Sequence, residues 1–149
     1  MVIYKSYKVE LNPTKKQKNL LVQSVGCARF AYNWGLAERM RLYEETKTST
    51  TAINQHKELC SIKKQKFPWM YDVTKCAAQE ALRNLERAYK NFLRNLKKGK
   101  KGKKAGFPKF KSKHSNKDSY SIATGSRYVT KTTVKLPNIP GNIKLKEHG

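Results

Sequence analysis

The sequence predicts an α+β protein in which a bundle of three to four helices is inserted into a small, mostly antiparallel β-barrel-like unit. Alternating apolar residues open the chain, helical periodicity dominates its middle, and short β-like segments separated by turn residues close it. The 149 residues fit one domain with room for a small second lobe. The expected limits are 1–11 for the first strand of a β lobe, 12–98 for a helical lobe, 99–106 for a basic linker and 107–149 for the remainder of the β lobe.

The first strand is expected over VIYKSYKVEL, residues 2–11, where apolar and polar side chains alternate with one slip that predicts a bulge. Pro13 cannot continue a strand. Thr14 and Gln17 have the spacing of a capping box, which predicts a helix that begins at Lys15.

Helical periodicity continues through GCARFAYNWGLAERMRLYEET, residues 26–46, which is apolar on two faces and is therefore expected near the centre of the bundle. Gly26 is either a turn between two helices or a close-packing point within one. A shorter helix is expected over AINQHKELCSIKKQ, residues 52–65, and the apolar side chains of KFPWMYD, residues 66–72, are expected to dock on the bundle.

The clearest periodicity in the chain predicts a last helix over residues 75–98, with Thr74 as its N-cap. Three β-like segments follow the basic linker, and Asn138, Pro140, Gly141 and Asn142 serve as turn residues near the end of the chain. These segments are SYSIAT (119–124), YVTKTTVKLP (128–137) and GNIKLK (141–146).

The chain carries 33 Lys and Arg against 10 Asp and Glu, a formal charge of +23, which indicates a polyanionic partner and most commonly nucleic acid. The charge is densest in KKGKKGKKAGFPKFKSKHSNK, residues 97–117, which has ten lysines and no carboxylate. Phe107 and Phe110 within it either stack on unpaired bases or pin the chain to the core. The predicted contacts to a nucleic-acid backbone are Lys97, Lys98, Lys100, Lys101, Lys103, Lys104, Lys109, Lys111 and Lys113.

Two polar pairs at i,i+4 spacing are further candidates. Lys75 and Gln79 share one face of the last helix, where Gln can read adenine and Lys a guanine or a phosphate, although such pairs occur on most helices. Arg29 and Asn33 form a polar stripe on an otherwise apolar helix, and they either anchor the bundle or contact a phosphate.

Catalytic chemistry is not expected from these residues. Asp72 and Asp118 are the only aspartates, both in predicted loops, so no converging carboxylates for divalent metal ions can be assembled. The three cysteines and three histidines form no zinc-ligand pattern and no pair of nucleophile and base. The odd, scattered cysteines fit a reducing, cytoplasmic setting, and no apolar run is long enough for a membrane span.

In their order, five motifs across almost the whole chain resemble the N-terminal part of the transposon-encoded OrfB/TnpB family of RNA-guided nucleases, relatives of the type V CRISPR effectors. They are LNPTKKQKNLL, GCARFAYNWGLAERMRLYEET, FPWMYDVTKCAAQEALRNLERAYKNFLRNLKKG, GFPKFKSK and KLPNIPG. The resemblance implies a wedge-like β-barrel, a helical recognition lobe, and guide RNA and double-stranded target DNA as partners. It also implies the older description of this region as a helix-turn-helix domain, and it places Lys75 and Gln79 where the family reads its target-adjacent DNA motif.

The family's RuvC-like catalytic domain and zinc-binding Cys pairs lie beyond these motifs, so this chain is expected not to cut DNA and its β lobe is expected to be incomplete. A divalent metal is expected only for the nuclease domain of a full-length relative, a metal-dependent DNA endonuclease. An excised portion and a naturally short gene product both fit. The resemblance implies a prokaryotic, cytoplasmic, nucleoid-associated protein; the alternative is a stand-alone helix-turn-helix protein that reads transposon DNA without RNA.

Overall fold

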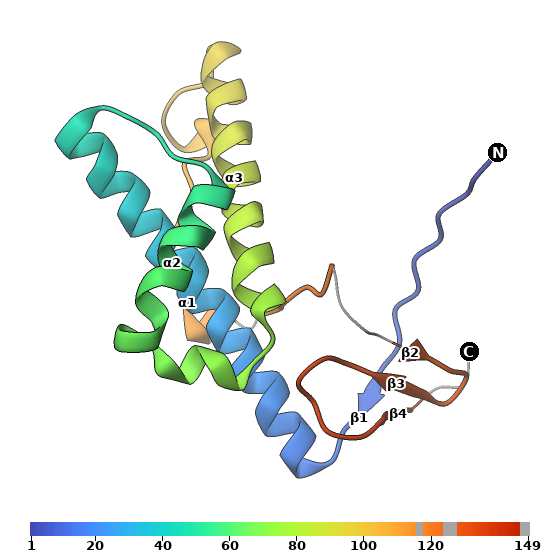
Figure 1. Ribbon diagram of the computed structural model, residues 1–149. Coiled ribbons are helices and arrows are strands. Elements are labelled where there is room, and N and C mark those ends of the chain that lie inside the picture. Colours follow the sequence, from blue (N-terminus) through green and yellow to red (C-terminus); the bar gives the residue numbers. More distant parts are fainter. Residues whose placement is uncertain (116–117, 124–127, 147–149) are drawn as a thin grey trace. The chain divides into compact units, whose positions relative to one another are not determined.

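The computed structural model describes residues 1–115, 118–123 and 128–146 (Figure 1). Three α-helices and four short strands confirm the α+β fold class. The helices are α1 (Lys15–Thr46), α2 (Ala52–Lys66) and α3 (Lys75–Lys97), and the strands are β1 (Leu11–Asn12), β2 (Tyr128–Val129), β3 (Thr133–Lys135) and β4 (Ile143–Leu145). Short 3-10 helices are η1 (Pro68–Asp72), η2 (Gly102–Ala105) and η3 (Lys113–Ser115).

The chain forms two units, one from residues 1–22 with 124–149 and one from residues 23–123. Residues 107–115 and 118–123 therefore group with the helices. The predicted limits of the β lobe, the helical lobe and the basic linker, at residues 12, 99 and 107, stay predictions.

The sheet of the first unit is antiparallel, with strand order β1-β4-β3-β2. Its two outer strands do not pair with each other among the described residues, so the sheet is open and the term β-barrel-like describes it only loosely. Ile143 of β4 is fully buried. The amide of Gln17 donates hydrogen bonds to the carbonyls of Pro140 (2.9 Å) and Asn142 (3.3 Å), which fastens the first turn of α1 to the loop before β4.

The strand predicted over residues 2–11 is wrong for all but its last residue. Pairing begins at Leu11, opposite Leu145. Before it, Glu10 contacts Lys146 without forming a ladder: its carbonyl accepts a hydrogen bond from the amide of Lys146, and its carboxylate forms an ion pair with Nζ of the same residue (2.6 Å). Alternation predicts which faces a strand would present, but a strand also needs a neighbour to pair with. The predicted strand at 119–124 is likewise absent over 119–123, and Thr124 lies outside the described residues.

The capping box is confirmed: the amide of Thr14 donates to Oε1 of Gln17 (3.0 Å), and the amide of Gln17 donates to Oγ1 of Thr14 (3.3 Å). The helix that it starts runs unbroken for 32 residues. Gly26 is therefore not a turn, and it is not a close-packing point either, because a Cβ built there would meet only Nη2 of Arg29, at 3.9 Å.

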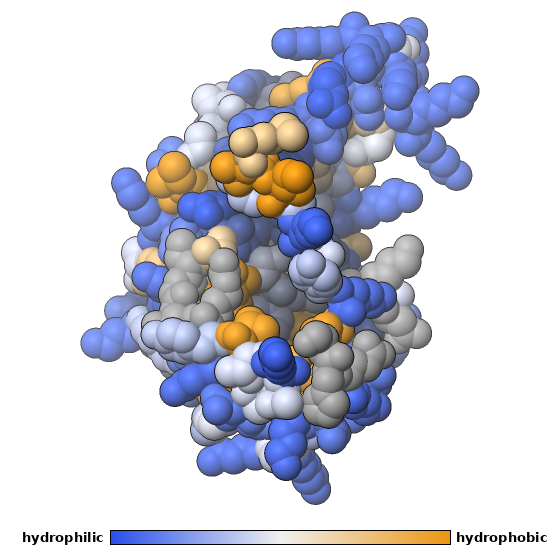
Figure 2. All heavy atoms as spheres, turned by 90° about the vertical axis from the view of Figure 1, so that its right-hand side faces the viewer, coloured by the Kyte–Doolittle hydropathy of each residue, from blue (hydrophilic) through white to orange (hydrophobic). Residues whose placement is uncertain are grey.

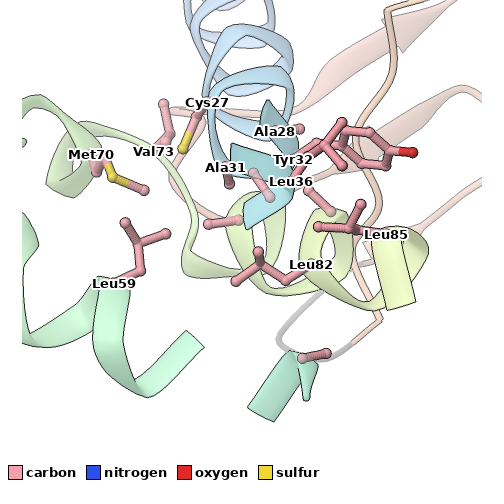
Figure 3. Packing of buried hydrophobic residues seen from close by; sticks show 14 residues of the cluster. Cys27, Ala28, Ala31, Tyr32, Leu36, Leu59, Met70, Val73, Leu82 and Leu85 are labelled. Carbon is pink, nitrogen blue, oxygen red and sulfur yellow. The ribbon is translucent and has the colours of Figure 1, made fainter. Parts of the chain in front are cut away.

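The close approach lies at Gly35 instead. A Cβ there would lie 2.6 Å from Cδ2 of Leu82 and 2.9 Å from Cδ2 of Leu85, both fully buried on α3. Figure 3 shows these two leucines beside Leu36 in the core. The absent side chain at this position lets α1 pack directly on α3.

A buried polar network joins the helices at the same level. The side chain of Gln55 on α2 is fully buried; its Nε2 donates to the carbonyl of Gly35 (2.9 Å), and its Oε1 accepts from Nε of Arg39 (2.8 Å). The guanidinium of Arg39 lies 5.1 Å from the ring centroid of Tyr89 on α3. Since both ends of the Gln55 amide are bonded, the burial of this group is compensated.

The segment between α2 and α3 docks on the bundle, as predicted. Phe30 of α1 makes edge-to-face contacts with Phe67 and Trp69, with ring centroids 4.7 and 5.1 Å apart, and Met70 is buried. Thr74 is the N-cap of α3, and its hydroxyl accepts a hydrogen bond from the amide of Cys76 (3.3 Å).

Candidate nucleic-acid interface

The backbone that follows α3 forms a closed loop. Asn95, in the last turns of α3, accepts a hydrogen bond from the amide of Lys100 at its carbonyl (3.1 Å) and donates from its side chain to the carbonyl of Ala105 (3.1 Å). Gly99 and Gly102 adopt positive φ angles of 81° and 58°, which other residues rarely adopt. We call residues 97–104 the lysine loop.

Six lysines project from the lysine loop, and all of them are exposed. They are Lys97, Lys98, Lys100, Lys101, Lys103 and Lys104. Figure 2 shows hydrophilic side chains projecting at the top of the helical unit, where α3 ends in Figure 1. Cations at a helix C-terminus also interact favourably with the helix dipole. The loop therefore presents a dense positive charge on a short, closed piece of backbone.

Residues 105–111, which we call the strap, run back along the helices. Ala105 and Pro108 are buried. At the far end, Asn33 of α1 donates to the carbonyl of Lys111 (2.9 Å) and accepts from its amide (2.8 Å), while Nζ of Lys111 lies 4.4 Å from the ring centroid of Tyr32. Asn33 thus holds the strap by both backbone groups of one residue.

Arg29, one helical turn before Asn33, forms an ion pair with Asp118 at 2.6 Å. The two predicted polar residues of α1 therefore lie together, and each fastens a later part of the chain to this helix. These contacts fit the interpretation of Arg29 and Asn33 as anchors, and contact of either residue with nucleic acid stays a prediction.

The two phenylalanines of the strap differ in their surroundings. Phe107 packs edge-to-face against Tyr89 and Phe92 of α3, with centroids 5.6 and 5.1 Å apart. Phe110 is 56% exposed, and no ring of the described residues lies against it. The reading that an aromatic pins the chain to the core thus fits Phe107.

Lys75 and Gln79 lie at the opposite end of α3 from the lysine loop. Lys75 is exposed and Gln79 is partly buried. The rise of 1.5 Å per residue separates Lys75 from Lys97 by about 33 Å. The structure thus places Lys75 and Gln79 at one end of α3 and the lysine loop at the other, so these two groups of predicted contacts do not lie together.

A further basic cluster, missed in the sequence, lies beside Lys75. His56 and Lys63 of α2 line a small hollow together with Lys75, and Nε2 of His56 lies 3.6 Å from Sγ of Cys60. The pKa of the His56 imidazole is lowered from its ordinary value, first by burial and then by the positive charges of Lys63, Lys75 and Arg83. The spacing of His56, Cys60 and Lys63 on one helix face was the available signal.

This lowered pKa predicts a pH dependence of stability. The unfolded chain takes up a proton on His56 near pH 6.5, whereas the folded chain does so only at lower pH, so the free energy of unfolding should fall as the pH drops below about 6.5. Urea titrations between pH 7.5 and 5 should show this fall, and His56→Gln should reduce it. His114→Gln, at an exposed histidine of η3, is the control. Equal slopes for wild type and His56→Gln would contradict the assignment.

Among residues 1–115, 118–123 and 128–146, no three metal-ligating side chains lie close enough to hold a metal ion. Within the same residues, no helix has the length and apolarity to cross a membrane.

Comparison with known proteins gives this surface a context. Residues 1–48 match the family model HTH_OrfB_IS605, described as a helix-turn-helix domain. This segment is about a third of the chain and is similar to the helix-turn-helix model of OrfB proteins. The predicted resemblance to OrfB/TnpB proteins is thereby confirmed.

Two relatives extend the similarity beyond residues 1–48. A candidate RNA-guided DNA endonuclease of Streptomyces pristinaespiralis is 25% identical over 118 residues, which cover 78% of this chain and 27% of the relative. The candidate RNA-guided DNA endonuclease InsQ of Escherichia coli is 29% identical over 121 residues, 80% of this chain and 28% of InsQ. The chain thus spans little more than a quarter of the length of these relatives.

The segment that matches this model, residues 1–48, contains β1 and the single long helix α1 in this structure. A DNA-reading helix-turn-helix places two helices at a steep angle across a turn of three to four residues. Residues 1–48 do not form that pair, because α1 continues unbroken from Lys15 to Thr46.

Proposed function

We propose that this chain is the nucleic-acid-binding portion of a TnpB-like transposon protein, which holds a guide RNA and recognises a target-adjacent DNA motif. The observation that supports it most directly is the lysine loop, six exposed lysines on a closed turn within a chain of charge +23. The similarity to RNA-guided endonucleases over about four fifths of the chain supports the class of partner. Cleavage in such a protein belongs to a RuvC-like domain, which the resemblance places beyond the matched motifs.

The two groups of predicted contacts at the ends of α3 have a spacing that suits one DNA duplex. About 33 Å separates Lys75 from Lys97, close to the length of one turn of duplex DNA. Lys75 and Gln79 then contact base edges at one end, while the lysine loop binds phosphates at the other.

A fluorescence-anisotropy titration with a structured RNA and with duplex DNA tests the proposal. Neutralising phosphates releases counterions, so the logarithm of the association constant should fall steeply and linearly with the logarithm of the salt concentration. Such binding normally loses most of its affinity over a range of about 50 to 300 mM salt. An affinity that stays constant over this range would rule the proposal out.

The role of Lys75 and Gln79 predicts a change in sequence preference. Selection from a random duplex library should enrich a short motif with the wild-type protein, and Lys75→Ala with Gln79→Ala should flatten this motif by about tenfold per contacted base pair. Total affinity should change only a few-fold. Lys90→Ala, an exposed lysine further along α3, is the control and should keep the motif. An unchanged motif in the double variant would refute the reading role.

The second candidate is a stand-alone helix-turn-helix protein that reads transposon DNA without RNA. The family match at residues 1–48 favours it, whereas the unbroken helix α1 in that segment does not. Nucleic acid that co-purifies with the chain discriminates the two. A discrete bound RNA supports the guide-RNA proposal, and duplex DNA alone supports the second candidate.

A further inference from the structure

Phe110 is exposed to solvent, and the backbone before and after it is held in place by contacts of its neighbours. Two residues before it, Pro108 is buried, and immediately after it both backbone groups of Lys111 are bonded to Asn33. The ring itself is 56% exposed. The position of this aromatic is thus set by the packing of its neighbours, although its own side chain packs on no other ring of the described residues.

The surroundings of Phe110 restrict what can cover it. A single exposed phenylalanine is ordinary on a protein surface. This one, however, lies in a stretch with no carboxylate from Lys97 to Ser115, and Lys109 and Lys113 beside it are exposed. A planar apolar ring among exposed cations matches a ligand with a flat face and negative charge at its edge, which is the chemistry of a nucleotide.

We propose that Phe110 is a stacking platform for an unpaired base, with Lys109 and Lys113 binding the phosphates on either side of that base. This inference rests on the proposed nucleic-acid function and deepens it, because it assigns a single-stranded segment to the strap. Bases within a duplex are stacked on both faces and cannot take this position.

Neighbouring side chains have other partners, which limits the site to these three residues. Phe107 is 42% exposed, but its ring packs edge-to-face against Tyr89 and Phe92 of α3. The ammonium group of Lys111 lies over Tyr32, so this lysine braces the strap.

The test uses the whole chain and three oligonucleotides of equal length: single-stranded RNA, single-stranded DNA and duplex DNA, each carrying 2-aminopurine. Stacking quenches this base, so the wild-type protein should quench both single strands. Phe110→Ala should remove the quenching and weaken single-strand binding by about tenfold, with duplex affinity unchanged. Phe110→Trp should restore both, and a difference between the RNA and DNA arms identifies the natural strand.

Tyr71→Ala is the matched control, since Tyr71 is 53% exposed, close to the 56% of Phe110, and has the ammonium group of Lys63 over its ring. It should leave quenching and affinity unchanged. Equal losses of single-strand and duplex affinity in Phe110→Ala, or full quenching without the ring, would overturn the stacking role. If the wild-type chain bound none of the three oligonucleotides, the proposed function itself would fail, and this inference with it.

Discussion

Replacing the six lysines of the lysine loop with glutamine should weaken binding to nucleic acid by about 100-fold at 150 mM salt. Each lysine that contacts a phosphate adds up to about 0.9 to the slope of the logarithm of affinity against the logarithm of salt concentration. With six lysines on one closed loop, we expect the slope to fall by about three to five units. Anisotropy titrations at several salt concentrations measure both quantities.

The fold should survive this replacement. All six side chains are exposed, and the hydrogen bonds that close the loop come from Asn95, Ala105 and the backbone of Lys100. Glutamine keeps most of the side-chain length and removes only the charge. An unchanged thermal transition would confirm that any loss of affinity comes from the contacts.

A control variant that loses the same charge elsewhere distinguishes binding at the lysine loop from a general effect of net charge. Six exposed basic residues outside the loop can be replaced by glutamine together: Lys47, Lys57, Lys64, Lys66, Arg87 and Lys90. If binding depended only on net charge, the two variants would lose affinity equally. We expect the loop variant to lose at least about ten times more, and equal losses would contradict the loop as the phosphate-binding site.

Local signals predicted the helices well. The capping box at Thr14 and Gln17, the N-cap at Thr74 and the stripe along α3 each act within a few residues, so they can be read from the chain directly. The first strand could not be read in this way. The alternation over residues 2–11 is real, but whether a strand forms depends on a partner elsewhere, and β4 reaches only Leu11 and Asn12.

In the candidate interface, too, local features could be predicted from the sequence and contacts between distant residues could not. Composition identified the lysines, yet the bonds from Asn95 that close their loop join residues five and ten positions apart in a lysine-rich, low-complexity stretch. Phe107 and Phe110 look equivalent in the sequence. They differ in their contacts with α3, because Tyr89 and Phe92 pack against the ring of Phe107 and not against that of Phe110. Contacts between distant segments thus decide which predicted residue is free to bind.

Gly35→Ala should lower the free energy of unfolding by about 1–2 kcal/mol. The new Cβ would lie 2.6 and 2.9 Å from methyl groups of Leu82 and Leu85, and Oε1 of Gln55 would lie at 3.4 Å. Both leucines are fully buried, so neither can swing aside without disturbing the core. The strain from overpacking, about 1–3 kcal/mol, should exceed the gain of about 1 kcal/mol in helix propensity. Urea unfolding followed by circular dichroism at 222 nm measures the difference.

Gly26→Ala is the matched control on the same helix, and it should have the opposite sign. Only Nη2 of Arg29, the tip of a flexible side chain, comes within 3.9 Å of the added Cβ. The gain in helix propensity should therefore appear almost undiminished, as a stabilisation of about 0.5–1 kcal/mol. Stabilisation by both substitutions would show that α3 can shift away from α1. Opposite signs would show that the close approach at Gly35 fixes the packing of α1 on α3, against which the strap and the lysine loop are held.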